Sequence, residues 1–212
     1  MKIRFLIMML MFGFLATGCA KTVTQIVSFG EQMTVSVTLR GNADNTANRY
    51  FLILGTSNLA VPLPPPDNIT YELIEPGTDP ISGVAADYYT NFYNTWAGYI
   101  ILDPGGYYLV KGPFVSGEAI TREALANLDA VSNTLNFSFR LDRIFDAIPD
   151  QIYFDFVSVA WPDGAEKLPS DHLSSTNAYI SRFEGSIQTV DDGADPSLPA
   201  SLDIERCNVE IQ

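Results

Sequence analysis

Tyrosine and tryptophan side chains are concentrated in one short stretch of the sequence, and they offer the plainest binding chemistry in the chain. Tyr89, Tyr93, Trp96 and Tyr99 lie close together, with two asparagines between them. Aromatic faces can stack on the C–H faces of sugar rings, and amide groups bind the surrounding hydroxyls. We take these four residues as candidate ligand-binding residues. The alternative is that their rings pack inside the fold, as large aromatic side chains usually do.

The single histidine, His172, lies in a polar stretch and does not complete a catalytic or metal site. No G-x-S-x-G motif supplies a serine nucleophile for it, and a catalytic zinc site normally uses more His or Cys ligands. Carboxylates recur at Asp142, Asp146, Asp150 and Asp155. Two facing carboxyls would suit glycoside hydrolysis, but spacing in sequence does not establish such a pair. We therefore predict no catalytic residues, no metal and no cofactor, and keep a secreted glycan-acting hydrolase as the alternative function.

Cys19 follows a short basic and apolar segment. Lys2 and Arg4 precede a largely apolar run over residues 5–15, which at about a dozen residues is too short to cross a hydrocarbon layer of roughly 30 Å. Small residues at 16–18 then lead into Cys19. This arrangement resembles the lipobox of bacterial lipoproteins, except that leucine stands four rather than three residues before the cysteine. The resemblance implies that residues 1–18 are a cleaved signal peptide and that Cys19 is the lipidated first residue; an ordinary secretory signal cleaved nearby is the alternative.

The mature chain is strongly acidic. Removing residues 1–18 takes away two of the 12 basic residues and none of the 25 acidic ones, which leaves a net charge of about −15. The chain has no basic cluster to neutralise phosphates, so we exclude nucleic acid as a partner. Once Cys19 is acylated, Cys207 is the only remaining cysteine, and no internal disulfide can form. The fold must then depend on burial, with Cys207 as a small buried side chain of the last strand.

Apolar patterns predict that most of the chain is β-strand. Residues 33–40 and 135–141 alternate apolar and polar side chains, which is typical of strands with one buried face. Residues 49–56 and 152–160 are almost continuously apolar, which is typical of strands buried on both faces. Shorter strands are expected at residues 69–74, within 179–190 and at the C-terminal end.

A turn and one helix complete the predicted elements. Asp103 to Gly106 contains a proline and two glycines, which predicts a hairpin between residues 96–102 and 107–111. Residues 116–131 place Ile120, Leu125 and Leu128 on one side and predict a helix that begins at Ser116. These elements favour a mainly β fold, an antiparallel β-sandwich of jelly-roll or Ig-like type with roughly seven to nine strands and one short helix. An α+β arrangement, in which the helix covers a sheet, is the alternative.

Three stretches together resemble exported β-sandwiches of the DOMON and family 9 carbohydrate-binding-module groups. These are the strand RYFLILGTS after a Gly/Asn/Asp loop, the alternating strand from Leu135 to Arg140, and the strand from Ile152 to Val159 with Asp163 after it. The resemblance covers about residues 33–183 and rests on hydrophobic patterns. It implies binding of sugars or haem. Haem sites in the DOMON group use Met and His ligands, and Met33 lies on an alternating face typical of a core.

These observations lead to one expected organisation. Residues 1–18 are the signal peptide, residues 19–30 a short lipidated tether, and residues 31–212 a single β-sandwich domain. We expect a non-catalytic binding module for a glycan or an envelope protein, held in the cell envelope by its lipid. Because Ala20 rather than aspartate follows the cysteine, the lipoprotein resemblance favours the outer membrane over the inner membrane.

Overall fold

The computed structural model describes residues 28–59, 95–114, 120–126, 132–162, 169–173 and 178–212. These residues form eleven strands and one short 3-10 helix, η2 (Leu141–Arg143). The strands are β1 (Gln32–Leu39), β2 (Asn48–Gly55), β3 (Gly98–Asp103), β4 (Gly106–Lys111), β5 (Arg122–Ala126), β6 (Thr134–Arg140), β7 (Gln151–Ala160), β8 (Pro169–His172), β9 (Tyr179–Ser181), β10 (Ile187–Asp191) and β11 (Ile204–Ile211). The signal peptide, Cys19 and the strand expected at residues 69–74 lie outside the described residues.

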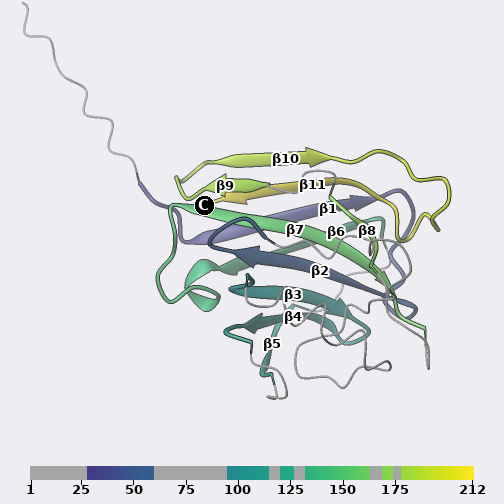
Figure 1. Cartoon of the computed structure of the whole chain (residues 1–212), viewed down its shortest axis with the longest axis horizontal. Helices are drawn as coiled ribbons and strands as arrows, with labels where there is room; N and C mark the ends of the chain where they lie inside the picture. The colour runs from purple at the N-terminus through teal and green to yellow at the C-terminus, as the bar shows by residue number, and fades with distance from the viewer. Residues whose placement is uncertain (1–27, 60–94, 115–119, 127–131, 163–168, 174–177) are drawn as a thin grey trace, which may run out of the picture.

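Two antiparallel sheets pack face to face, as predicted for a β-sandwich (Figure 1). The smaller sheet has the strand order β10-β11-β1-β6. The larger sheet has the order β5-β4-β3-β2-β7-β8, and β9 also pairs with β7. Every strand pair is antiparallel. Among the described residues, no helix is both long enough and apolar enough to span a membrane.

The smaller sheet buries one face only, which confirms the alternating pattern of its strands. In β1, Met33, Val35, Val37 and Leu39 are fully buried, while the residues between them are partly exposed. The same alternation holds in β6. Successive side chains of a strand point to opposite faces, so a period of two places every second residue in the core between the sheets.

The larger sheet is buried on both faces in its centre, as the continuous apolar runs predict. Tyr50, Leu52 and Leu54 of β2 join the core between the sheets. Phe51 and Ile53 point the other way, into a second apolar cluster that we call the outer-face cluster. Its buried members are Phe51, Ile53, Leu59, Trp96, Tyr99, Ile101, Val110, Val157 and Val159. The hairpin of β3 and β4 is also confirmed, with Asp103 opposite Gly106. Gly106 has φ of 121°, a conformation that favours glycine.

The helix predicted at residues 116–131 is wrong where the structure describes it. Arg122–Ala126 is strand β5, which pairs with the edge of β4. Its side chains favour helices, but intrinsic propensity is a weak preference that tertiary pairing overrides. Here the exposed backbone edge of β4 gains a partner. Arg122 Nη1 also lies 2.7 Å from Asp103 Oδ2 and its guanidinium stands 5.7 Å from the Tyr108 ring centre.

Candidate binding cleft

Two of the predicted binding residues lie inside the outer-face cluster rather than on the surface. The Tyr99 ring is fully buried and packs against Phe51, Trp96 and Phe114, with ring centres 5.9, 6.1 and 5.5 Å away. Trp96 is also buried. Neither ring presents a face to solvent, because both pack among the apolar side chains on the outer face of the larger sheet. Tyr89 and Tyr93 lie outside the described residues.

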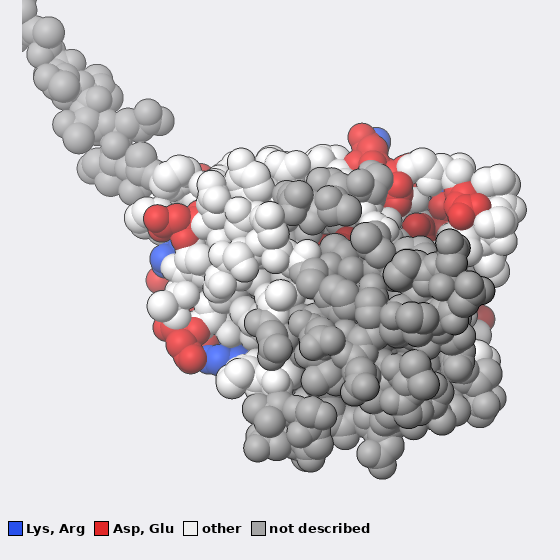
Figure 2. Space-filling view, in the orientation of Figure 1, with Lys and Arg blue, Asp and Glu red and all other residues white. Residues whose placement is uncertain are grey.

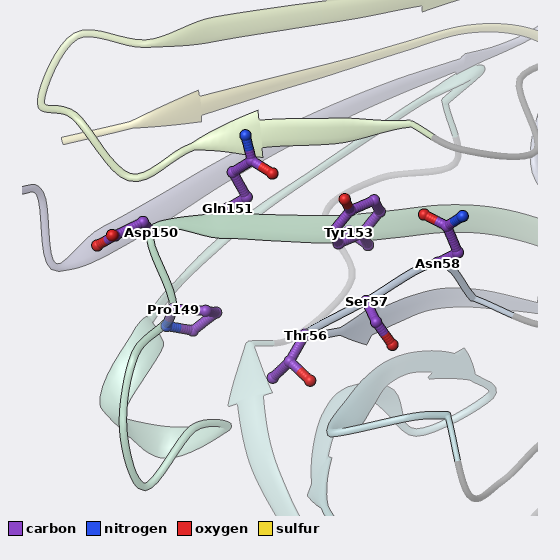
Figure 3. A pocket seen from close by; sticks show the side chains of 7 residues that line it. All are labelled: Thr56, Ser57, Asn58, Pro149, Asp150, Gln151 and Tyr153. Carbon is purple, nitrogen blue, oxygen red and sulfur yellow. The ribbon is translucent and has the colours of Figure 1, made fainter.

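A cleft with polar walls opens where β2 ends and β7 begins (Figure 3). Its volume is about 770 Å³, and the described residues that line it are Thr56, Ser57, Asn58, Pro149, Asp150, Gln151 and Tyr153. Two hydroxyls, two amides, one carboxylate and the aromatic ring of Tyr153 therefore line the same cleft. Such groups both donate and accept hydrogen bonds, which suits a ligand that is rich in hydroxyls.

The register between β2 and β7 builds this cleft. Gly55, the last residue of β2, pairs with Tyr153 of β7. The chain then turns through residues 56–58 and returns to the outer-face cluster at Leu59, which is buried. A Cβ atom at Gly55 would stand 2.5 Å from Leu59 Cδ2 and 2.7 Å from the Thr95 carbonyl oxygen. Glycine therefore suits this close turn, after which Thr56, Ser57 and Asn58 line the cleft together with the start of β7.

Tyr153 is the aromatic side chain of the cleft and is held from one side by a second tyrosine. Its ring centre lies 5.6 Å from that of Tyr179 on β9, with the ring planes tilted by 44°. The two residues are paired across β7 and β9, and Tyr179 is exposed. Gln151 lies on the same side of β7 two residues earlier (Figure 3). Pairing with β9 thus fixes both an aromatic ring and an amide of the cleft.

Arg182, directly after β9, ties the cleft to the segment that enters the sandwich. Its backbone N–H donates to the Asp150 carbonyl oxygen at 2.9 Å. Its side chain donates to the carbonyl oxygens of Gly30 and Ile148, each at 3.3 Å. The guanidinium also lies 5.1 Å from the centre of the Phe29 ring. Arg182 therefore links the start of β7 to the segment before β1 through one backbone hydrogen bond and its side-chain contacts.

The structure separates the carboxylates that were candidates for hydrolysis. Asp142 lies 2.8 Å from Arg140 Nη2, and Asp146 lies 2.6 Å from Lys111 Nζ, both at the surface. Asp150 lines the cleft. Asp155 is buried, and that burial raises its pKa well above its ordinary value. Across the described ranges, His, Cys, Asp and Glu side chains form no group of three that could hold a metal ion.

His172 and Cys207, the two other residues that the sequence singled out, lie away from the cleft. His172, from the polar stretch noted in the sequence, is the last residue of strand β8, and its Nδ1 stands 3.9 Å from Asp155 Oδ2. Cys207 is fully buried on the core side of β11, as predicted, and burial raises the pKa of its thiol. Neither residue reaches the cleft lining.

Comparisons with protein-family models, with curated proteins and with solved structures find no match to this chain. The resemblance to DOMON and family 9 carbohydrate-binding modules therefore stays a prediction, as does the lipobox at Cys19. The β-sandwich fold rests on the strand pairing and burial described above.

Proposed function

We propose that this chain is an envelope lipoprotein, anchored through Cys19, whose β-sandwich binds a glycan in the cleft beside Tyr153. The observation that carries the binding site is the combination of one partly exposed tyrosine ring with the hydroxyls and amides of Thr56, Ser57, Asn58 and Gln151. An aromatic face supports the apolar side of a sugar ring, while hydroxyls and amides satisfy its polar rim. The resemblance to carbohydrate-binding modules points to the same ligand class.

The size of the cleft favours a glycan over a protein partner. Ligand sites for small molecules are clefts of roughly 300–1,000 Å³, and this cleft has a volume of about 770 Å³. A stable protein interface buries about 800 Å² on each partner and is centred on apolar anchors. The cleft walls are mostly polar, so an oligosaccharide segment fits the observed surface better.

Hydrolysis of the bound glycan has less support. Glycosidases place two carboxyl groups on either side of the bond that is cleaved. Among the described residues that line the cleft, only Asp150 carries a carboxylate. Binding without hydrolysis therefore requires only the hydroxyls, amides and aromatic ring that line the cleft.

A binding experiment on the chain from Ala20 onward tests the cleft. A glycan array identifies the best oligosaccharide, and calorimetric titration measures its affinity for the wild type and for Tyr153→Leu. Leucine keeps an apolar side chain but removes the ring, so we expect a loss of affinity of about 5- to 10-fold, which corresponds to about 1–1.5 kcal/mol of stacking. Tyr108→Leu is the matched control, because Tyr108 is also partly buried on the larger sheet but does not line the cleft. Equal affinities for wild type and Tyr153→Leu would place the glycan elsewhere.

The anchor is tested separately by the mass of the mature N-terminus after expression in a bacterium. We expect a chain that begins at Cys19 with a diacylglyceryl group on its sulfur and that partitions into detergent. Cys19→Ser removes the acceptor thiol and should give an unlipidated chain. A mature terminus elsewhere, or an unmodified Cys19, would refute the anchor without affecting the cleft.

A further inference from the structure

Two phenylalanine rings are stacked in solvent at the point where the chain enters the sandwich. Phe29, just before β1, and Phe183, just after β9, have ring centres 5.5 Å apart and planes inclined by 27°. The two residues are 48% and 45% exposed. Ile187, which begins β10 after the next turn, is 62% exposed. We call these three residues the aromatic corner.

The backbone holds the aromatic corner in place. Phe29 and Phe183 form an antiparallel bridge. The Gly30 N–H donates to the Arg182 carbonyl oxygen at 2.9 Å, and the Glu184 N–H donates to the Ser28 carbonyl oxygen at 3.1 Å. The turn after Phe183 is closed by the Ser186 N–H, which donates to the Phe183 carbonyl oxygen at 2.9 Å. A hydrogen-bonded backbone therefore holds the two rings exposed to solvent. Exposed apolar patches can mark interaction sites, so the corner is a candidate contact surface.

The distance along the chain from Cys19 limits what the aromatic corner can meet. Nine residues lead from Cys19 to Ser28, and a fully extended chain spans at most about 3.3–3.6 Å per residue. Ser28 therefore lies within about 32 Å of the acylated cysteine, and Phe29 of the corner within about 36 Å, whatever path the tether takes. The C-terminus lies at the same end (Figure 1), and the N–H groups of Glu31 and Gln32 both donate to the Gln212 carbonyl oxygen.

We propose that the aromatic corner rests on the lipid bilayer and orients the sandwich with this end toward the membrane. This inference rests on the proposed lipid anchor at Cys19. Transfer of phenylalanine and isoleucine side chains from water to the lipid interface is favourable, because it removes apolar surface from water. The acyl chains and the tether set only an upper limit on the distance of the domain from the membrane, whereas a second contact at the corner fixes which end faces it.

Charge determines the kind of lipid surface that fits. Acidic groups outnumber basic ones over the visible described surface (Figure 2), and Glu31 and Glu184 flank the corner in sequence. The Arg182 guanidinium is already engaged with two carbonyl oxygens and the Phe29 ring. The contact is therefore apolar and suits a zwitterionic surface, since an anionic surface would repel the acidic chain.

A spin label at Ile187 tests this orientation in the full lipidated chain on phosphatidylcholine vesicles. Ile187→Cys keeps both rings, Cys19 is blocked by its lipid, and Cys207 is fully buried, so a nitroxide reagent modifies the new thiol. Ser197→Cys is the control, because Ser197 is exposed in the loop between β10 and β11, at the opposite end of the sandwich. We expect the label at 187 to collide more with oxygen than with a water-soluble nickel chelate, and the label at 197 to show the reverse. Phe29→Ser with Phe183→Ser should abolish the oxygen preference at 187.

The failure of the orientation and the failure of the anchor give different results. Flotation shows that the protein is bound to the vesicles, and the mass of the floated protein shows whether Cys19 carries its lipid. If the protein floats but the label at 187 is as accessible to the nickel chelate as the label at 197, the orientation is overturned and the anchor stands. If the protein stays in solution and its mass shows no lipid on Cys19, the anchor fails and the orientation fails with it. Circular dichroism of the double serine variant confirms that the sandwich is intact.

Discussion

Asp155 on β7 is buried and His172 on β8 is partly buried, and Asp155 Oδ2 lies 3.9 Å from His172 Nδ1. This distance exceeds that of a hydrogen bond, and within the described part of the chain neither atom has a hydrogen-bond partner. The other oxygen, Asp155 Oδ1, accepts from the backbone N–H groups of Phe156 at 2.8 Å and Leu173 at 3.2 Å. Asp155 is 1% exposed. Burial raises the pKa of its carboxyl well above the ordinary value, and the negative charges of Asp171 and Asp192 raise it further.

We expect Asp155 to make the folded chain less stable as the pH rises from about 4 toward neutral. An aspartate in the unfolded chain ionises near pH 4, whereas the raised pKa of Asp155 keeps it protonated in the folded chain to higher pH. Below about pH 4 both states hold the proton, so the group adds no pH dependence there. Above that pH the free energy of unfolding falls by up to about 1.4 kcal/mol per pH unit until the folded pKa is reached. Urea denaturation across this range measures the slope.

Asp155→Asn isolates this contribution. Asparagine keeps an acceptor oxygen for the N–H groups of Phe156 and Leu173 but cannot ionise. The variant should therefore have a shallower slope and exceed the wild type in stability at neutral pH. Asp150→Asn is the matched substitution at an exposed aspartate. An unchanged slope in Asp155→Asn would show that other groups, such as the partly buried Asp171, cause the pH dependence.

The long strands β1, β2, β6 and β7 were predictable from the sequence, because their periodicity follows from which of their faces are buried. The alternation from Met33 to Leu39 and the continuous run of β2 both follow from which faces of a sheet are covered. The prediction was wrong for Arg122–Ala126, because the side chains of this segment favour a helix whereas its backbone pairs with β4. The cleft was not predictable. Ser57 and Tyr153 lie far apart in sequence. They line the same cleft because the strand register sets Gly55 opposite Tyr153, and no local sequence pattern encodes that register.

Gly55→Ala should destabilise the sandwich and distort the cleft. The new methyl group would meet Leu59 Cδ2 at 2.5 Å and the Thr95 carbonyl oxygen at 2.7 Å, so the turn must shift. Overpacking of this kind costs about 1–3 kcal/mol of unfolding free energy, and affinity for the glycan should fall as well. Gly193→Ala is the matched control, because its methyl group meets nothing within 4 Å and should change stability by less than about 0.5 kcal/mol. Urea denaturation compares the two, and equal stabilities would show that the turn relaxes freely.

Tyr50→Phe should remove a buried hydrogen-bond junction at the other end of β2. The Tyr50 hydroxyl donates to the Ser201 carbonyl oxygen at 2.8 Å and accepts from the Asp44 N–H at 3.0 Å. Without it, two polar backbone groups lose their partner, which costs about 1–3 kcal/mol. Tyr179→Phe, at an exposed tyrosine, should have almost no effect on stability. Thermal unfolding measures both, and a Tyr50→Phe variant as stable as wild type would show that water replaces the hydroxyl.

Cys207 should report global unfolding in the chain from Ala20 onward, which lacks Cys19. Its side chain is fully buried between the sheets, opposite Val37 and Val190 on the neighbouring strands. Because burial also raises the pKa of the thiol, the reactive thiolate is scarce in the folded state. We expect an aqueous disulfide reagent to modify this thiol only as fast as the sandwich opens, and at once in concentrated urea. Gly55→Ala should accelerate modification by the factor by which it raises the unfolded population, about tenfold for each 1.4 kcal/mol of lost stability. Gly193→Ala should leave the rate almost unchanged. Rapid modification of the wild type without denaturant would contradict the packing of β11 against β1.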